Sequence, residues 1–448
     1  MASSELTRRG FLRQAGAACA AAVAAPYVIP ASALGADGRP APSERITLGS
    51  IGLGGRGTVN FNTFLGRGDV QILALCDVDK GSTRYEDAWY RGLEPARVET
   101  EKRYAALKSS GAYKACSTYT DFRELLARDD IDAVVIATPD HWHGPIAVAA
   151  AKAGKDIYCE KPLSLTVGDG RAMVEAVKRY GRVFQCGSQR RSDARCRFSC
   201  ELVRNGRIGK LHTVRVGLMS GHWIRSNASK TNAPEPVPEG FDYEMWLGPA
   251  PWAQYTFNRC HWNWRWNRDY SGGMVTDWGA HYIDMAHWGM GTEETGPVEV
   301  QGKGAFPDAG ELWNTATGFE FECLYANGVK MVVKSGGGGV RFEGADGWVN
   351  LEGGTNPPGL AKSVIGPNEI HLYESSDQHG NFIECVKSRR RTAAPIEIAH
   401  RSITPAHLGN IAMLLGRKLK WDPVAERFID DAGADRFLAR PKRAPWRV

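Results

Sequence analysis

A glycine-rich loop between a predicted strand and a predicted helix constrains the fold of this chain most. Residues 52–57 read Gly-Leu-Gly-Gly-Arg-Gly and stand between an apolar run and a helical pattern. In such a loop Gly52 permits the tight turn, Gly54 lets the backbone approach a pyrophosphate, and Gly57 lets the helix pack close to the sheet. The N-terminus of the following helix supplies partial positive charge. The loop therefore predicts a dinucleotide-binding fold.

An acidic residue follows at the expected distance. A second predicted strand ends in Cys76-Asp77, twenty residues after the last glycine of the loop. A carboxylate there accepts hydrogen bonds from the ribose hydroxyls and repels a 2′-phosphate, which favours NAD over NADP. Gly55 and Arg56 complete the expected cofactor loop, and the Arg56 guanidinium keeps NADP open because it can reach a phosphate.

The 448 residues are long enough for two domains. Up to residue 186 strands and helices alternate, which predicts a doubly wound parallel sheet, and after 187 β-like segments separated by Gly-rich turns predict an α+β domain with an antiparallel sheet. We expect a Rossmann domain at 45–186 and a substrate-binding and oligomerisation domain at 187–448. The expected strands are 46–51, 70–76, 133–137, 156–159, 183–186, 211–218, 298–302, 318–322, 330–333 and 348–352; the expected helices are 58–65, 121–127, 144–153, 167–180 and 196–205.

The first 33 residues do not read as part of the fold. Ser4 to Arg13 carry a twin arginine followed by Gly-Phe-Leu, an Ala-rich apolar stretch comes next, and residues 31–33 offer a small-residue cleavage site. This resembles a twin-arginine export signal, so we expect passage through the twin-arginine machinery to a periplasmic or other extracytoplasmic location. Residues 34–44, rich in Gly and Pro, are expected to be a linker.

Composition excludes several classes of function. The formal net charge is +6, of which the signal segment supplies two charges, and this is too mild to predict a nucleic-acid partner. No later segment is apolar for long enough to span a membrane. The cysteines after Cys19 are scattered, without the Cys and His spacing of a zinc site, so we expect small buried side chains and no metal.

Two segments that follow strands are candidates for the reaction centre. Thr138-Pro139 begins the run 138–143, and His143 at its end is assigned to packing or to a cofactor contact. Glu160-Lys161-Pro162 follows the next strand, where a lysine would project over the nicotinamide site. A lysine of an ordinary surface loop is the alternative.

A third candidate segment carries a carboxylate and an imidazole. If a helix begins at about Asp277, then Asp277, His281 and Asp284 share one face, and a carboxylate beside an imidazole can orient and tune a general base. A capping aspartate and a structural histidine are the alternative.

Together these motifs resemble the glucose-fructose oxidoreductase/inositol dehydrogenase (Gfo/Idh/MocA) superfamily over nearly the whole chain after residue 45. The resemblance implies a C-terminal domain with a large open antiparallel sheet, tightly held NAD(P), and a homo-oligomer, a dimer or a tetramer. It implies that Lys161 contacts the substrate hydroxyl and the nicotinamide, that Asp277 is a substrate-side carboxylate, and that His281 is the acid/base. Asp284 is assigned a supporting position next to these three residues.

The segment 260–266, Cys-His-Trp-Asn-Trp-Arg-Trp, resembles an exported subgroup of that family. Trp264 can stack on a sugar ring, and Arg259 and His261 can bind hydroxyls or an acidic sugar, although core packing is the alternative for the tryptophans. We therefore expect an NAD(P)-dependent oxidoreductase for a sugar or polyol. Two alternatives stay open: redox-neutral glycoside hydrolysis, elimination or epimerisation through a transient keto sugar, and sugar binding without catalysis.

Overall fold

The computed structural model describes residues 40–85, 88–108 and 111–446. The predicted signal sequence 1–33 and the first part of the predicted linker lie outside the described residues. The last part of that linker includes a short 3-10 helix, η2 (Pro42–Glu44). From Ile46 onward the chain forms one unit, which contains every element discussed below.

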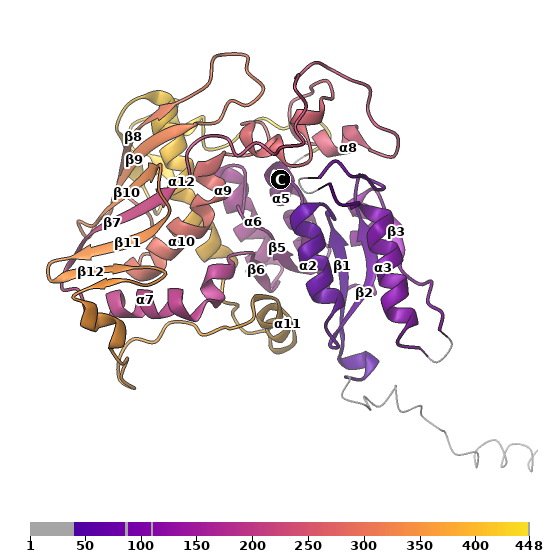
Figure 1. Ribbon diagram of the computed structural model, residues 1–448, viewed down its shortest axis with the longest axis horizontal. Coiled ribbons are helices and arrows are strands. Elements are labelled where there is room, and N and C mark those ends of the chain that lie inside the picture. Colours follow the sequence, from indigo (N-terminus) through magenta and orange to yellow (C-terminus); the bar gives the residue numbers. More distant parts are fainter. Residues whose placement is uncertain (1–39, 86–87, 109–110, 447–448) are drawn as a thin grey trace, which may run out of the picture. The chain divides into compact units, whose positions relative to one another are not determined.

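A six-stranded parallel sheet forms the first part of this unit, with the strand order β3-β2-β1-β4-β5-β6 (Figure 1). The chain winds outward from β1 in one direction and from β4 in the other, so a crevice opens at the carboxyl ends of these two strands. This confirms the predicted doubly wound sheet. The strands are β1 (Ile46–Ile51), β2 (Val70–Cys76), β3 (Ser117–Tyr119), β4 (Ala133–Ile136), β5 (Asp156–Cys159) and β6 (Phe184–Cys186).

Helices cover both faces of the parallel sheet. In β4, Ala133 and Val135 pack into one apolar cluster, and Val134 and Ile136 pack into another on the opposite face. Burial on both faces explains why these strands read as continuous apolar runs. The first face carries α2 (Gly55–Leu65), α3 (Leu93–Ala105) and α11 (Gln378–Ser388); the second carries α4 (Phe122–Leu126), α5 (Asp140–Lys152) and α6 (Val167–Arg179).

A nine-stranded sheet forms the second part, in the order β13-β12-β11-β7-β10-β9-β8-β14-β15 (Figure 1). As expected for this domain, the sheet is large and mostly antiparallel; the one parallel pair that the described residues form in it joins β7 to β10. The glycines before β11 were expected to form only a turn, and the strand after them was missed. The strands are β7 (Leu211–Leu218), β8 (Glu299–Ala305), β9 (Gly318–Leu324), β10 (Lys330–Ser335), β11 (Gly339–Gly344), β12 (Gly347–Asn350), β13 (Thr355–Asn356), β14 (Leu419–Asp422) and β15 (Arg427–Phe428).

One face of this sheet is covered by α7 (Ala194–Arg204), α10 (Gly279–Met290) and α12 (Ile396–Leu415). In β9, Phe321 and Cys323 point into this core, while Glu320 and Glu322 point away from it. Helix α12 also contacts α6, so the helical layer joins the two sheets (Figure 1).

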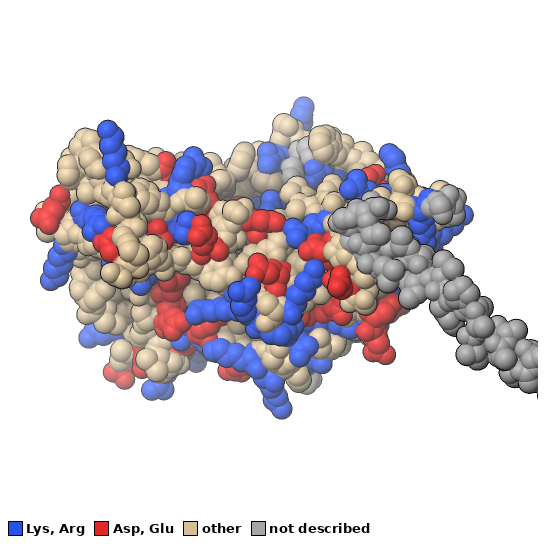
Figure 2. Space-filling model, turned by 90° about the horizontal axis from the view of Figure 1, so that it is seen from below, with Lys and Arg blue, Asp and Glu red and all other residues tan. Residues whose placement is uncertain are grey.

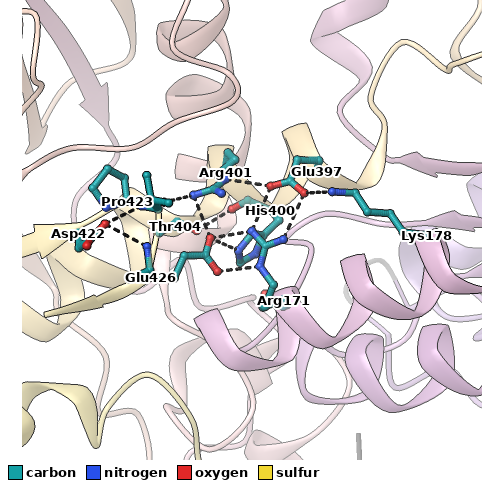
Figure 3. A network of polar contacts seen from close by, with 12 residues as sticks. Arg171, Lys178, Glu397, His400, Arg401, Thr404, Asp422, Pro423 and Glu426 are labelled. Carbon is teal, nitrogen blue, oxygen red and sulfur yellow. Dashed lines mark hydrogen bonds and ion pairs between the residues drawn. The ribbon is translucent and has the colours of Figure 1, made fainter.

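A network of ion pairs reinforces the contact between α6 and α12 (Figure 3). Arg171 on α6 binds Glu397 on α12 at 3.0 Å and Glu426, in the turn between β14 and β15, at 2.8 Å. His400 and Arg401 on α12 also contact Glu426, at 2.8 and 3.0 Å. Burial would raise the pKa of Glu426, but Arg171 and His400 lower it to about 2. The two carboxylates therefore stay ionised and hold three elements together.

The surface and the cysteines are consistent with an ordinary globular chain. Figure 2 shows basic and acidic side chains interspersed over the face it displays. All nine cysteines of the described residues are buried, and none of them forms a disulfide. No helix in the described part of the chain has the length and apolarity needed to cross a membrane.

Candidate active site

A cavity of about 680 Å³ lies at the carboxyl edge of the parallel sheet. Residues that follow β1, β2, β4 and β5 form one side of it, and segments between β7 and α10 form the other. Every part of this lining belongs to the unit that begins at Ile46. Those predicted site residues that line the cavity are Gly52, Gly54, Gly55, Arg56, Asp77, Thr138, Pro139, Glu160, Lys161, His261, Trp264, Asp277 and His281.

The glycine loop is shaped for a ligand that approaches its backbone. Gly52 has φ +87°, and a Cβ there would lie 2.7 Å from the carbonyl oxygen of Ala137. Gly57 does not line the cavity; a Cβ on it would lie 2.1 Å from the carbonyl oxygen of Gly52, so it allows α2 to pack against the turn. Helix α2 begins at Gly55 and directs its free N–H groups at the cavity. This cradle fits a pyrophosphate.

Asp77 stands at the carboxyl end of β2, beside the glycine loop. Its carboxylate accepts a hydrogen bond from the backbone N–H of Leu53 at 2.5 Å and another from Asp79 at 2.8 Å. Burial raises the pKa of Asp77 to about 7, and the backbone N–H groups oppose that shift. The two N–H groups fix the carboxylate where the fold places the ribose of a dinucleotide.

Glu160 holds a basic side chain at the cavity. Its carboxylate accepts hydrogen bonds from Arg56 at 2.9 Å, from Asn60 at 2.9 Å and from Gln189 at 3.1 Å. Burial would raise the pKa of Glu160, but Arg56 outweighs this effect and the net shift is downward. Glu160 therefore acts through Arg56, whose guanidinium is partly exposed to the cavity.

His143 does not line the cavity, which corrects its assignment as a cofactor contact. Its two ring nitrogens lie 2.7 Å from the carbonyl oxygen of Pro162 and 2.9 Å from that of Thr138. The ring is buried between the segments that follow β4 and β5. His143 therefore fixes the relative position of two segments that do line the cavity.

Lys161 and Asp277 form an ion pair in the cavity wall. Lys161 Nζ lies 2.6 Å from Asp277 Oδ1 and 3.1 Å from the Asp277 carbonyl oxygen, and Arg265 Nε lies 3.9 Å from the same carboxylate. Burial would raise the pKa of Asp277, but Lys161 and Arg265 lower it. The pair therefore remains charged.

His281 lies beside this pair, although not on the expected continuous helix. Helix α9 (Met274–Asp277) ends before Trp278, and α10 begins at Gly279. His281 Nδ1 is buried, and no group in the described part of the chain forms a hydrogen bond with it. Burial and the nearby Lys161 cation lower the pKa of His281 well below its usual value, while Asp277 opposes them. The imidazole is therefore neutral and can accept a proton.

Two further predicted site residues face away from the cavity. Asp284 accepts hydrogen bonds from Arg191 at 2.8 and 2.7 Å and from Ser402 at 2.6 Å, in the core beneath α10. Asp284 follows His281 by three residues on α10, but its carboxylate is turned into the core, where Arg191 and Ser402 hold it. Arg259 donates a hydrogen bond to Tyr270 at 3.0 Å and is absent from the lining. Neither residue is placed to bind substrate.

Sequence reasoning missed Asp140 in this site. Asp140 lines the cavity in the first turn of α5 and accepts a hydrogen bond from Ser271 at 2.6 Å. Burial raises its pKa to about 7; Ser271 opposes this, and the charge of Asp277 adds to it. Its position directly after the strand-end Thr138-Pro139 was the available signal.

Several buried polar atoms at the cavity have no hydrogen-bond partner among the described residues. They are Thr138 Oγ1, Arg225 Nε, His261 Nε2 and His281 Nδ1. Such atoms are costly unless a ligand or water satisfies them. No group of three or more His, Cys, Asp and Glu side chains in the described residues is arranged to hold a metal ion. The donors instead fit an organic ligand with hydroxyl and anionic groups.

Two family models cover this architecture. The model "Oxidoreductase family, NAD-binding Rossmann fold" matches residues 46–188, and "Oxidoreductase family, C-terminal alpha/beta domain" matches residues 194–448. The first of these makes the parallel-sheet domain an NAD-binding domain, in agreement with its glycine cradle.

Individual relatives are more distant. Myo-inositol 2-dehydrogenase of Thermotoga maritima is 28% identical over 247 residues, which are 55% of this chain and 55% of that protein. A glycosyl hydrolase family 109 protein of Stenotrophomonas maltophilia is 28% identical over 257 residues, 57% of this chain and 50% of that one. The chain spans about half the length of these curated relatives. The crystal structure of aldose-aldose oxidoreductase from Caulobacter crescentus shares the fold, with a TM-score of 0.57 and 21% identity over 84% of this chain and 99% of that one.

Proposed function

Because this chain belongs to the Gfo/Idh/MocA oxidoreductase family, we propose that it is an NAD-dependent oxidoreductase that interconverts a hydroxyl and a keto group of a sugar or polyol. The observation that carries the proposal is the Lys161–Asp277 pair beside the unpartnered His281 Nδ1, in the same cavity as the glycine cradle. A cation, a carboxylate and a neutral imidazole are the groups needed to bind and deprotonate a secondary alcohol.

The cofactor would be held by the backbone of the glycine loop, with Asp77 at a ribose and Arg56 near the phosphates. When bound, its nicotinamide supplies the hydride acceptor and donor. NADP remains a minor alternative because Arg56 can also bind a phosphate, although Asp77 opposes it.

Three side chains of the protein carry out the other steps of the reaction. His281 accepts the hydroxyl proton, since its imidazole is neutral and its Nδ1 is free for a new hydrogen bond. The Lys161 ammonium stabilises the negative charge that develops on the substrate oxygen. Asp277 orients Lys161 and can accept a hydrogen bond from a neighbouring substrate hydroxyl. Reduction of a ketone uses the same groups in reverse.

A redox-neutral reaction is the second candidate, and the relatives named as family 109 glycosyl hydrolases favour it. In it, oxidation to a keto sugar would acidify the neighbouring C–H, elimination, epimerisation or glycosidic cleavage would follow, and the hydride would return. Lys161 and His281 serve this reaction equally well. Both residues also argue against a purely sugar-binding role, which requires neither.

We extend the proposal to location and assembly. The twin arginine and small-residue segment at the N-terminus support export through the twin-arginine route, which carries folded proteins and so permits the cofactor to be bound before export. Export also favours a cofactor that is recycled within the site, by a second sugar or by the returning hydride. The resemblance to the family supports a homo-oligomer, a dimer or a tetramer.

The test is turnover with the cofactor that copurifies. The folded protein is incubated with aldoses, ketoses, inositols and glycosides, the bound nucleotide is measured as NAD or NADH, and the sugar products are identified. Net reduction of NAD supports the oxidoreductase, whereas cleaved or epimerised sugar with unchanged NAD supports the second candidate. Unchanged nucleotide together with unchanged sugars would refute both.

A further inference from the structure

Arg225 lies in the cavity, pairs with no carboxylate of the described residues, and is not used by the chemistry proposed above. It belongs to the segment between β7 and α8 (Tyr243–Leu247) and lines the cavity together with Trp223 and Trp262. Its guanidinium carbon lies 3.8 Å from the ring centroid of Trp262 and 4.7 Å from that of Trp223. Two indole faces therefore hold this cation in place.

The other charges of the cavity are largely compensated. Arg56 pairs with Glu160, and Lys161 pairs with Asp277. The carboxylate of Asp77 is held by backbone N–H groups, and that of Asp140 by Ser271. In the described residues no ion pair or hydrogen bond joins the Arg225 side chain to another group, and its Nε is buried without a partner.

Arg225 is linked to the reaction centre by a short series of contacts. Arg225 stacks on Trp262, and the guanidinium carbon of Arg265 also lies 4.1 Å from the centroid of that ring. Arg265 in turn lies 3.9 Å from Asp277, the partner of Lys161. These contacts connect Arg225 to the reaction centre through one tryptophan and one arginine.

We propose that the substrate is an anionic sugar, bearing a carboxylate or a sulfate ester that Arg225 binds while Trp223 and Trp262 flank it. This inference rests on the proposed function and specifies its substrate class. A planar guanidinium forms two parallel hydrogen bonds with a carboxylate or with two sulfate oxygens, and the indole faces leave its edge free to do so. Partial exclusion of water by the rings strengthens that interaction.

Acidic sugars paired with neutral sugars of the same configuration test the proposal. The protein with its bound NAD is given D-glucuronate and D-glucose, D-galacturonate and D-galactose, and D-galactose 6-sulfate. Binding is followed by tryptophan fluorescence, because Trp223 and Trp262 flank the proposed anion site, and turnover is followed by the redox state of the bound nucleotide. At least one acid is expected to bind at least tenfold more tightly than the neutral sugar with which it is paired. The preferred acid shows whether the site binds a carboxylate or a sulfate.

Arg225→Gln is expected to reduce that preference to threefold or less, and Arg225→Lys to restore it in part. Arg179→Gln is the matched control: Arg179 lies exposed on α6, outside the cavity, with its guanidinium carbon 6.0 Å from the ring centroid of Tyr180. This control variant should keep the preference of the unmodified protein.

Three results would overturn the inference. Equal binding of acids and neutral sugars is one, and an unchanged preference in Arg225→Gln is another. Loss of copurified NAD from Arg225→Gln is the third, because it would assign Arg225 to a phosphate of the cofactor. Turnover of neutral sugars without preference for acids would contradict only the anion site, whereas preferential binding of acids with no chemical change would contradict only the proposed reaction.

Discussion

Lys161 Nζ lies 2.6 Å from Asp277 Oδ1, so the second residue after β5 of the parallel sheet is paired with the last residue of α9, more than a hundred positions later. The pair connects the cofactor-binding half of the chain with the half that carries the second sheet. Its carboxylate also faces Arg265, and His281, on the next helix α10, follows it by four residues. The reaction centre exists only when both halves are folded against each other.

Replacement of either reactive group should stop turnover without releasing the nucleotide. Lys161→Met and His281→Asn are each expected to lower kcat at least a hundredfold, because charge stabilisation and proton transfer each contribute about 10²–10⁴-fold in enzymes. NAD released on denaturation should stay at the level of the unmodified protein. Turnover within threefold of normal in both variants would remove these residues from the mechanism.

Asp77→Asn should weaken the hold on NAD and relax the discrimination against NADP. Loss of a charged hydrogen bond costs about 1.5–3 kcal/mol, which corresponds to roughly a ten- to hundredfold weaker affinity. Isothermal titration with NAD and NADP measures both effects.

Asp132→Asn is the matched control for Asp77, since Asp132 also accepts a backbone N–H, that of Thr47 at 2.8 Å, but at the opposite end of β1. An NAD affinity that falls equally in both variants would indicate general destabilisation.

Acid should destabilise the contact between α6 and α12. The pKa of Glu426 is lowered to about 2 in the folded protein and that of Glu397 is lowered further, so both contribute stability above pH ~4.5 that is lost as the pH falls toward 2. Burial also lowers the pKa of His400, so its protonation in the unfolded chain below about pH 6.5 acts in the same direction.

Arg171→Met tests this network through urea unfolding at several pH values. We expect a loss of about 2–3 kcal/mol at pH 7 and a smaller loss at pH 3, because the carboxylates then approach neutrality in the unfolded chain. Arg179→Met on the exposed side of the same helix should have little effect at either pH. A loss that does not depend on pH would contradict the electrostatic interpretation.

The first domain was more predictable from sequence than the second for a physical reason. A strand buried on both faces, such as β4, gives an uninterrupted apolar run whose ends are easy to locate, and the glycine loop marks where the strand order begins. Strand β7 shows only alternating burial, and its parallel partner β10 comes more than a hundred residues later, so nothing local indicates that pairing.

The residues of the candidate site were also predictable from sequence only in part. Motif residues such as Lys161 and His281 were identified from the chain, but the position of Asp284 depended on its partners Arg191 and Ser402, which come from distant segments. Arg225 entered the site only through tertiary packing, because its partner Trp262 comes from a distant segment, whereas Asp140 follows a strand end that the sequence already indicated.

The most direct measurement of the central claim is the redox state of the nucleotide that copurifies with the protein, before and after incubation with sugars under conditions where no other oxidant is present. The account predicts bound NAD that becomes NADH with one class of sugar in the unmodified protein and stays NAD in Lys161→Met. A protein that holds no nucleotide even after reconstitution with NAD, or whose NAD and sugars are all unchanged, would contradict it.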